Sequence, residues 1–242
     1  MEELNQNNCR ISIITVSYNC KDEIKKTIES ILPHISNELE YIIIDGGSTD
    51  GTLEIIRYYA TIHRIKYISE PDDGIYDAMN KGVRYAKGEW ISFINCGDYL
   101  YRVPDLPLSC MSDNIMAIAY AVESELGIDY PMFNRLLRIY NTIPHQGLYY
   151  NRNEFPGFDT SYKIFADYAL SLDFLNACKI IITHKDLVAF HSMTGLSNNI
   201  KFKQELVRII RKKNPFFFFA LSMMYFKLRG FKYKMKNLKN KF

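Results

Sequence analysis

Apolar runs and helix-spaced apolar positions alternate along residues 11–94. Short β-rich runs predict strands at residues 11–16, 39–45, 65–69 and 90–94, the first of them buried. Apolar residues at helical spacing between these runs predict helices around 24–35, 53–59 and 76–86, with Pro33 limiting the first. This alternation indicates an α/β fold, with a mostly parallel central sheet flanked by helices.

The pattern is less regular from Val103 onward. Residues 115–122 and 180–183 are predicted as further strands, residues 165–177 as a helix and residues 200–213 as an amphipathic helix. A chain of 242 residues, 48% of them hydrophobic, can bury one substantial core. A disordered or collagen-like protein is therefore excluded.

Polar residues follow each of the first four predicted strands. In open α/β sheets, ligands bind beyond the carboxyl ends of the strands, so these residues are the first candidates for a site. They are Ser17-Tyr18-Asn19, Asp45-Gly46-Gly47, Glu70-Pro71-Asp72 and Asn95-Cys96-Gly97-Asp98. Each segment alone also fits a turn or a helix cap, and Ser48 or Asp50 is expected to cap the second helix.

Several segments together resemble family 2 glycosyltransferases, especially small bacterial enzymes of surface polysaccharide biosynthesis. They are TVSYN, IIIDGGSTDGT, EPDDGIYDAMNKGVRYAKGEWISFINCGD and, near residue 145, HQG. The resemblance implies a GT-A fold over residues 1–205, with a Rossmann-like nucleotide-sugar half at about 10–100 and an acceptor half at about 101–205. It also implies transfer of a hexosyl group from a nucleoside-diphosphate sugar, commonly UDP-linked, to a saccharide, with inversion at the anomeric carbon.

The family's metal motif is usually DXD, and the matching stretch here is Asn95-Cys96-Gly97-Asp98, which keeps the last carboxylate alone. Mn²⁺ or Mg²⁺ bound to a diphosphate needs one or two protein carboxylates, so Asp98 could suffice. His191, in VAFHSMTGLS, matches a loop whose histidine can contact metal or diphosphate. The alternatives are that Asp98 caps a turn and that His191 is a packed or surface residue.

The resemblance also implies a set of nucleotide-binding residues. Asp45 would accept a hydrogen bond from an N–H of the base, Asp72 lies on the nucleotide side, and Lys81 or Arg84 would meet phosphate. Lys81 and Arg84 also fit solvated surface charges. The full expected set is Ser17, Asn19, Asp45, Asp72, Lys81, Arg84 and Asn95.

An inverting transfer needs a base that removes the proton of the attacking hydroxyl. The stretch GFDTSYKIFADYALSL matches the family's base segment and puts Asp167 in that role, with Ala166 replacing the acid that often precedes it. Asp159 is the rival, and a capping role is the alternative for both. His145 and Gln146 match the family's acceptor-side segment.

The sequence also bears on three other functions. A sugar-nucleotide-forming nucleotidyltransferase should carry a glycine-rich phosphate loop after the first strand, but residues 18–22 contain no glycine. A dinucleotide-dependent oxidoreductase lacks GxGxxG at the same turn. A catalytically silent scaffold that docks on membranes stays open because the metal motif is reduced.

Charge is divided unevenly along the chain. Residues 206–242 carry eleven Lys or Arg and no acid, a net charge of +11, while the rest carries −8. The apolar run Phe216–Phe226 is shorter than the roughly 20 residues that span a bilayer. Aromatic residues bracketed by cations favour an anionic membrane surface, and the alternative is that they pack on the catalytic domain. Nucleic-acid binding is not expected, because no stacking motif accompanies a base-reading element.

The five cysteines are scattered without a CxxC pair, so neither a zinc site nor a disulfide framework is expected. Residues 1–10 show no basic and apolar secretory pattern. Together with the basic segment 206–242, these features predict a cytoplasmic protein, peripheral at the inner face of the cell membrane, whose acceptor is lipid-linked.

Overall fold

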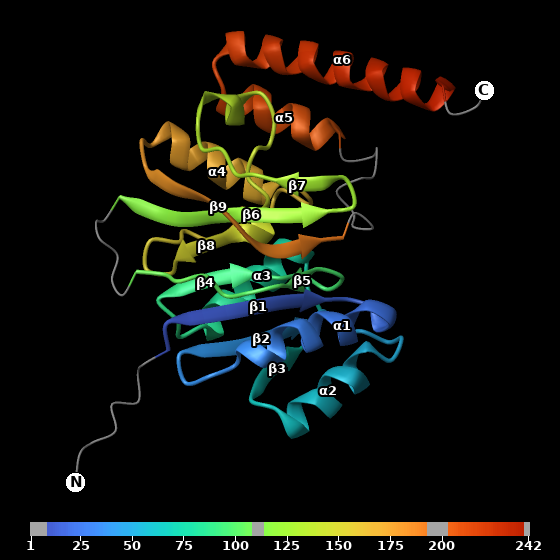
Figure 1. Ribbon diagram of the computed structural model, residues 1–242, viewed down its shortest axis with the longest axis vertical. Helices are drawn as coiled ribbons and strands as arrows, with labels where there is room; N and C mark the ends of the chain where they lie inside the picture. The colour runs from blue at the N-terminus through green and yellow to red at the C-terminus, as the bar shows by residue number, and fades with distance from the viewer. Residues whose placement is uncertain (1–8, 108–113, 193–202, 240–242) are drawn as a thin grey trace.

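The computed structural model describes residues 9–107, 114–192 and 203–239, and its core is one mixed sheet (Figure 1). The described strands are arranged in the order β3-β2-β1-β4-β8-β6-β9-β5, with β7 paired to β6. Their bounds are β1 Ile11–Ser17, β2 Leu39–Asp45, β3 Ile65–Ser69, β4 Trp90–Phe93, β5 Tyr99–Leu100, β6 Ile115–Ser124, β7 Gly127–Asp129, β8 Leu148–Asn151 and β9 Ile180–His191.

Helices cover both faces of this sheet and one of its ends (Figure 1). The α-helices are α1 Lys21–Ile31, α2 Thr52–Ile62, α3 Ile75–Tyr85, α4 Ala166–Asn176, α5 Lys203–Lys213 and α6 Phe216–Lys239. Three short 3₁₀ helices are η1 Leu32–His34, η2 Arg135–Arg138 and η3 His145–Gly147. Pro33 lies in η1, directly after α1, as expected from its effect on helices.

The parallel half of the sheet confirms the predicted α/β fold. β1 pairs in parallel with β2 and β4, and β2 pairs in parallel with β3. Alternate residues of β1 enter different cores, Ile14 on the face of α3 and Ile13 on the face of α1 and α2. Gly82 lets α3 approach closely, because a Cβ there would come 2.5 Å from Cγ2 of Ile14. The first four strands therefore end together at one edge, where a ligand site can form.

The second half of the sheet is less regular than the first. β8 pairs antiparallel with β4 and β6, whereas β9 pairs in parallel with β6 through a register that shifts three times. The predicted strand 180–183 is only the beginning of β9, which continues through the polar stretch Thr183–Asp186 to His191. This continuation carries His191 to the same edge of the sheet as the polar ends of β1 to β4.

The basic C-terminal segment is largely helical and partly packed on the body. Ile209 and Ile210 of α5 are fully buried in the main core, and Ser222 of α6 is fully buried against the carbonyl oxygen of Arg138. Residues 216–226, predicted as a short apolar run, belong to a helix of 24 residues. Within the described part of the chain, no helix combines the length and apolar character needed to cross a membrane.

Two local expectations were wrong. Cys20 and Cys96 form a disulfide, with their Cα atoms 6.7 Å apart, because the loops after β1 and β4 lie side by side. The N-cap of α2 is Gly51 in a left-handed conformation, not Ser48 or Asp50. The Asp50 carboxylate nevertheless accepts a hydrogen bond from the amide of Thr52, the first residue of α2.

Candidate functional site

A cleft of about 1270 Å³ runs along the carboxyl edge of the parallel strands. One side is formed by loops that follow β1, β2, β3 and β4, and the other by segments of the second half of the chain and by α6. The lining residues fall within 16–20, 46, 71–79, 95–98, 128–132, 140–146, 164–167, 191–192 and 225.

Asp98 and His191 meet in this cleft. Asp98 follows a tight turn in which Gly97 has φ +98°, and His191 is the last residue of β9. The distance from Nδ1 of His191 to Oδ1 of Asp98 is 3.0 Å, and the amide of Ser192 donates to the same oxygen at 2.9 Å. The structure thus brings together the two residues predicted to hold a metal, although 92 residues separate them in sequence.

Gln146 completes this cluster from η3. Its Nε2 lies 2.9 Å from Oδ2 of Asp98 and 2.6 Å from Nδ1 of His191, and its side chain is buried. It lines the cleft, and these contacts hold Asp98 and His191 in place, while its contact with the acceptor stays a prediction.

Electrostatics at the cluster favour a positive charge on the imidazole of His191. Burial works to lower the pKa of His191, but the hydrogen bond and charge of Asp98 outweigh it, so the net pKa is raised. Within the described residues, no group of three or more His, Cys, Asp or Glu side chains is arranged to hold a metal. Two protein ligands still fit Mn²⁺ or Mg²⁺ when diphosphate oxygens and water supply the other positions.

Asp167 lies in the first turn of α4 and lines the same cleft. Its Oδ1 accepts a hydrogen bond of 2.7 Å from the hydroxyl of Tyr76, and its side chain is mostly buried. Burial and the Asp167 charge raise the pKa of Tyr76 well above its usual value, so this phenol stays a donor. The rival carboxylate, Asp159, is exposed, accepts a hydrogen bond from the amide of Ser161 and does not line the cleft.

His145 lies between Asp167 and Asn95. Its Nδ1 is 3.7 Å from Oδ2 of Asp167, and its Nε2 is 3.0 Å from Nδ2 of Asn95. Burial lowers the pKa of His145 despite the nearby carboxylates, which favours the neutral imidazole. Oδ1 of Asn95 is buried without a hydrogen-bond partner among the described residues, so it could accept a hydrogen bond from a ligand.

A separate part of the cleft is lined by residues at or just after the ends of β1, β2 and β3. They are Ser17, Tyr18, Gly46 and Asp72. Tyr18 is 67% exposed although it lines the cleft, so one face of its ring is available. A Cβ on Gly46 would come 2.9 Å from Oδ2 of Asp72 and 3.3 Å from the Tyr18 ring, so glycine leaves both side chains in place. Burial raises the pKa of Asp72, an effect that Lys81 opposes.

Two basic residues predicted to meet phosphate have other positions. Nζ of Lys81 is 2.5 Å from Asp72, 3.1 Å from Glu70 and 3.4 Å from Asp77. Burial opposes its charge, but these carboxylates give a net rise in its pKa, and the ammonium group holds the loop after β3. Arg84 is exposed near the C-terminus of α3, away from the strand ends, and does not line the cleft.

Asp45 and Asn19 form hydrogen bonds with the loop that follows β2. Asp45 is fully buried, and its carboxylate accepts hydrogen bonds from the hydroxyl of Ser69 and from the amides of Gly47 and Ser48. Asn19, at φ +47°, accepts a hydrogen bond from the amide of Thr49. Neither residue lines the cleft, so both fix the loop that follows β2.

Two residues that shape the site, Tyr76 and Glu205, were not among the predicted site residues, and Tyr18 was predicted only by its place after the first strand. The Glu205 carboxylate, from α5, accepts hydrogen bonds from the amides of Lys163, Ile164 and Phe165 at 2.8 to 2.9 Å. It therefore holds the chain that leads into α4 and Asp167. Its position as the last acid before the basic segment was visible in the sequence, but its partners, some forty residues earlier, were not.

The chain is similar to known glycosyltransferases. The model of the family described as "Glycosyl transferase family 2" matches residues 12–102, which include β1 to β4 and Asp98. A PGL/p-HBAD biosynthesis glycosyltransferase of Mycobacterium bovis is 26% identical over 223 residues, which cover 82% of this chain and 83% of the relative.

Two solved structures share the fold. TarS 1-349 of S. aureus in complex with UDP-GlcNAc has a TM-score of 0.62 and 15% identity, covering 84% of this chain and 66% of that one. The mannosyltransferase PcManGT of Pyrobaculum calidifontis, in complex with GDP-Man and Mn²⁺, has a TM-score of 0.62 and 17% identity. The match covers 88% of this chain and 68% of that one. At such low identity, these likenesses show the fold alone.

Proposed function

Because the chain belongs to glycosyltransferase family 2, we propose that it is a metal-dependent, inverting hexosyltransferase that uses a nucleoside-diphosphate sugar. The observation that carries the proposal is the convergence of Asp98, His191 and Asp167 in one cleft. The acceptor is a saccharide, and UDP is the expected carrier. Bacterial surface polysaccharide biosynthesis is the proposed setting, as the sequence resemblance implies.

The nucleotide is proposed to lie at the end of the cleft formed by Tyr18 and Asp72. An exposed aromatic ring offers a stacking face for a base, and a carboxylate accepts a hydrogen bond from a base N–H. Asp72 replaces Asp45 in this role, because Asp45 is buried and its carboxylate already accepts hydrogen bonds from several groups. Ser17 and Asn95 also line the cleft and remain candidate donor contacts.

Asp98 and His191 would hold Mn²⁺ or Mg²⁺ in the cleft. The metal would neutralise the negative charge that develops on the leaving diphosphate. Gln146 would keep the two side chains aligned through its contacts at 2.9 and 2.6 Å.

Asp167 is proposed as the general base. It would take the proton of the acceptor hydroxyl while the acceptor oxygen bonds to the anomeric carbon and the bond from that carbon to the diphosphate oxygen breaks. Attack from the face opposite the leaving group inverts the anomeric configuration. Tyr76 would orient Asp167, and His145 would border the acceptor.

The test is transfer or donor hydrolysis measured with UDP-sugars and GDP-mannose. Activity that requires Mn²⁺ or Mg²⁺ and is lost with EDTA is the expected result. Transfer that survives EDTA would contradict the metal assignment. Release of pyrophosphate from sugar phosphate and nucleoside triphosphate would support a nucleotidyltransferase instead, and the absence of every activity would support a silent scaffold.

The acceptor is proposed to be lipid-linked and presented at the inner face of the cell membrane, an anionic surface on which α6 would lie. Its outer face carries Phe216, Phe217, Met224 and Leu228, which are 82%, 66%, 56% and 56% exposed. Lys227 is exposed on the same helix. An apolar stripe flanked by cations suits the interface between headgroups and acyl chains.

Co-sedimentation of the full chain with phosphatidylglycerol vesicles tests this surface. Replacing Phe216 and Phe217 by Ser should weaken binding at least about tenfold, because each buried ring contributes roughly 1.5–3 kcal/mol. Ile62→Ser is the matched control, since Ile62 is 55% exposed on α2 at the opposite end of the molecule (Figure 1). Equal binding by the double variant and the wild type, or no binding by either, would contradict the proposal.

A further inference from the structure

The inner face of α6 reaches the catalytic cleft. Tyr225 lines the cleft together with Tyr140, and the two rings stack with centroids 4.7 Å apart and planes 13° apart. Tyr225 lies one residue after Met224, so the helix turns it about 100° away from that exposed position. The C-terminal helix is therefore part of the wall of the site as well as of the molecular surface.

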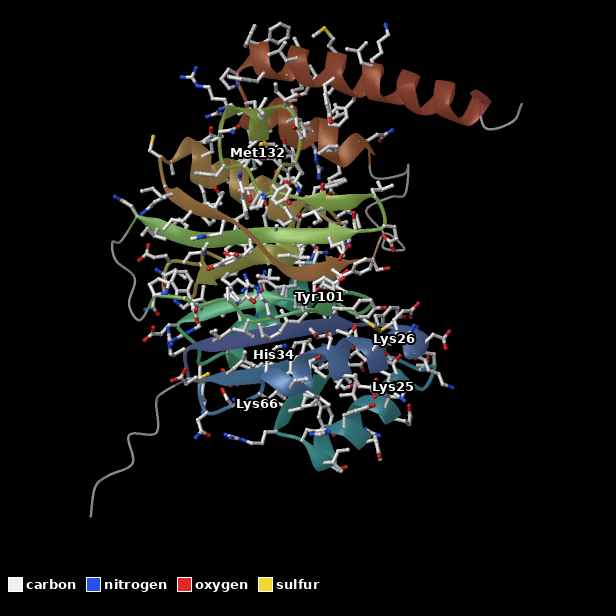
Figure 2. All side chains as sticks on the ribbon, viewed as in Figure 1. Lys25, Lys26, His34, Lys66, Tyr101 and Met132 are labelled. Carbon is white, nitrogen blue, oxygen red and sulfur yellow. A yellow bond between two sulfur atoms is a disulfide. The ribbon has the colours of Figure 1, made fainter. Side chains whose placement is uncertain are left out.

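This end of the cleft differs in character from the nucleotide end. Its walls include Ile128, Tyr130 and Met132, which are 45%, 50% and 37% exposed. Met132 lies at the end of the molecule that carries α5 and α6 (Figure 2). The exposed polar residues that accompany them in the lining are Asp129 and Asn141.

Aromatic rings beside a few polar groups are suited to a pyranose ring. The apolar C–H face of a sugar can cover a tyrosine ring, while its hydroxyl groups need hydrogen-bond acceptors and donors at the rim. A free acyl chain would not use the Asp129 carboxylate, and a phosphate group would be repelled by it. The chemistry at this end therefore favours a neutral sugar.

We propose that Tyr225 and Tyr140 form the acceptor-saccharide subsite, with a pyranose ring stacked on the pair and Asp129 accepting a hydrogen bond from a sugar hydroxyl. The inference rests on the proposed function, because Asp167 lines the same cleft and would receive the proton from this sugar. It gives α6 a role in substrate recognition that is independent of any contact with lipid.

The experiment measures binding of methyl pyranosides of glucose, galactose, mannose and N-acetylglucosamine to the full chain with Mn²⁺ and UDP or GDP present. The wild type should bind at least one of them, and Tyr225→Ala should weaken that binding at least about tenfold, as expected for the loss of one stacking ring. Tyr225→Phe should stay within about twofold of the wild type, since it keeps the ring. Binding of UDP or GDP alone should not change in either variant.

Met224→Ala is the matched control, because Met224 is the neighbouring residue on the outer face of α6 and does not line the cleft. It should bind sugar as the wild type does. Equal sugar binding by Tyr225→Ala and the wild type would overturn the subsite, as would a wild type that binds nucleotide but none of the pyranosides. Failure to bind either nucleotide would instead overturn the proposed function on which the subsite rests.

Discussion

Glu205 offers a test of how the fold positions the proposed base. Its carboxylate accepts three backbone hydrogen bonds, at 2.8, 2.9 and 2.9 Å, just before α4 begins. Asp167 lies two residues after Phe165, the last of these amides. Glu205→Ala would leave three amides of this turn without their acceptor, and the first turn of α4 would lose a negative charge at its N-terminus.

The expected loss in the free energy of unfolding can be estimated from these contacts. A hydrogen bond to a charged group contributes about 1.5–3 kcal/mol, but water can reach this partly exposed turn, so we expect about 2 kcal/mol for the three together. With a urea slope of roughly 3 kcal/mol per molar, the unfolding midpoint would fall by about 0.7 M. Because a small misplacement of a base is costly, we also expect kcat to fall about tenfold with donor KM within about twofold.

Urea unfolding followed by circular dichroism, together with steady-state kinetics, measures both effects. Glu205→Gln keeps an acceptor oxygen but not the charge, so it should show roughly half the loss of stability. Asp159→Ala is the control, because this exposed carboxylate accepts a hydrogen bond from the amide of Ser161, two residues away, and does not line the cleft. A Glu205→Ala variant with the stability and kcat of the wild type would refute the reasoning.

Two further substitutions test the neighbourhood of the base. Asp167→Asn should lower kcat at least about a hundredfold with donor affinity nearly unchanged, measured by steady-state kinetics and UDP titration, and a large loss of UDP binding would mean that Asp167 holds the donor or the fold. Tyr76→Phe removes the 2.7 Å hydrogen bond to Asp167 and should lower kcat about tenfold without changing donor KM, whereas an unchanged kcat would exclude a positioning role.

The parallel half of the fold could be predicted closely from the sequence. β2 and β3 have the predicted bounds, and β1 and β4 differ from them by one residue at one end. Each is a short run rich in β-branched and aromatic residues that is followed by polar or glycine residues, which is a strong local signal. The pattern failed where burial depends on distant partners, as in β8, or where polar residues interrupt a strand, as at Thr183–Asp186 in β9.

The position of the site could be predicted from the sequence, but the contacts among its side chains could not. The strand-end argument located the cleft, and the family resemblance indicated Asp98, His191 and Asp167, which all line it. Neither of these could show that three acids surround Lys81, although the i,i+4 spacing of Asp77 and Lys81 indicated one of the ion pairs. Contacts between segments far apart in sequence, such as Cys20 with Cys96, have no local signature.

The most direct test of the central claim is sugar transfer by Asp98→Ala and Asp98→Asn at saturating Mn²⁺. Asp98→Asn keeps the size of the side chain and one oxygen that can still accept a hydrogen bond from the amide of Ser192, so it removes the charge with little change in packing. The account predicts that both variants fold, as judged by circular dichroism, and that both lose metal-dependent transfer. Wild-type turnover in either variant at saturating Mn²⁺ would contradict it.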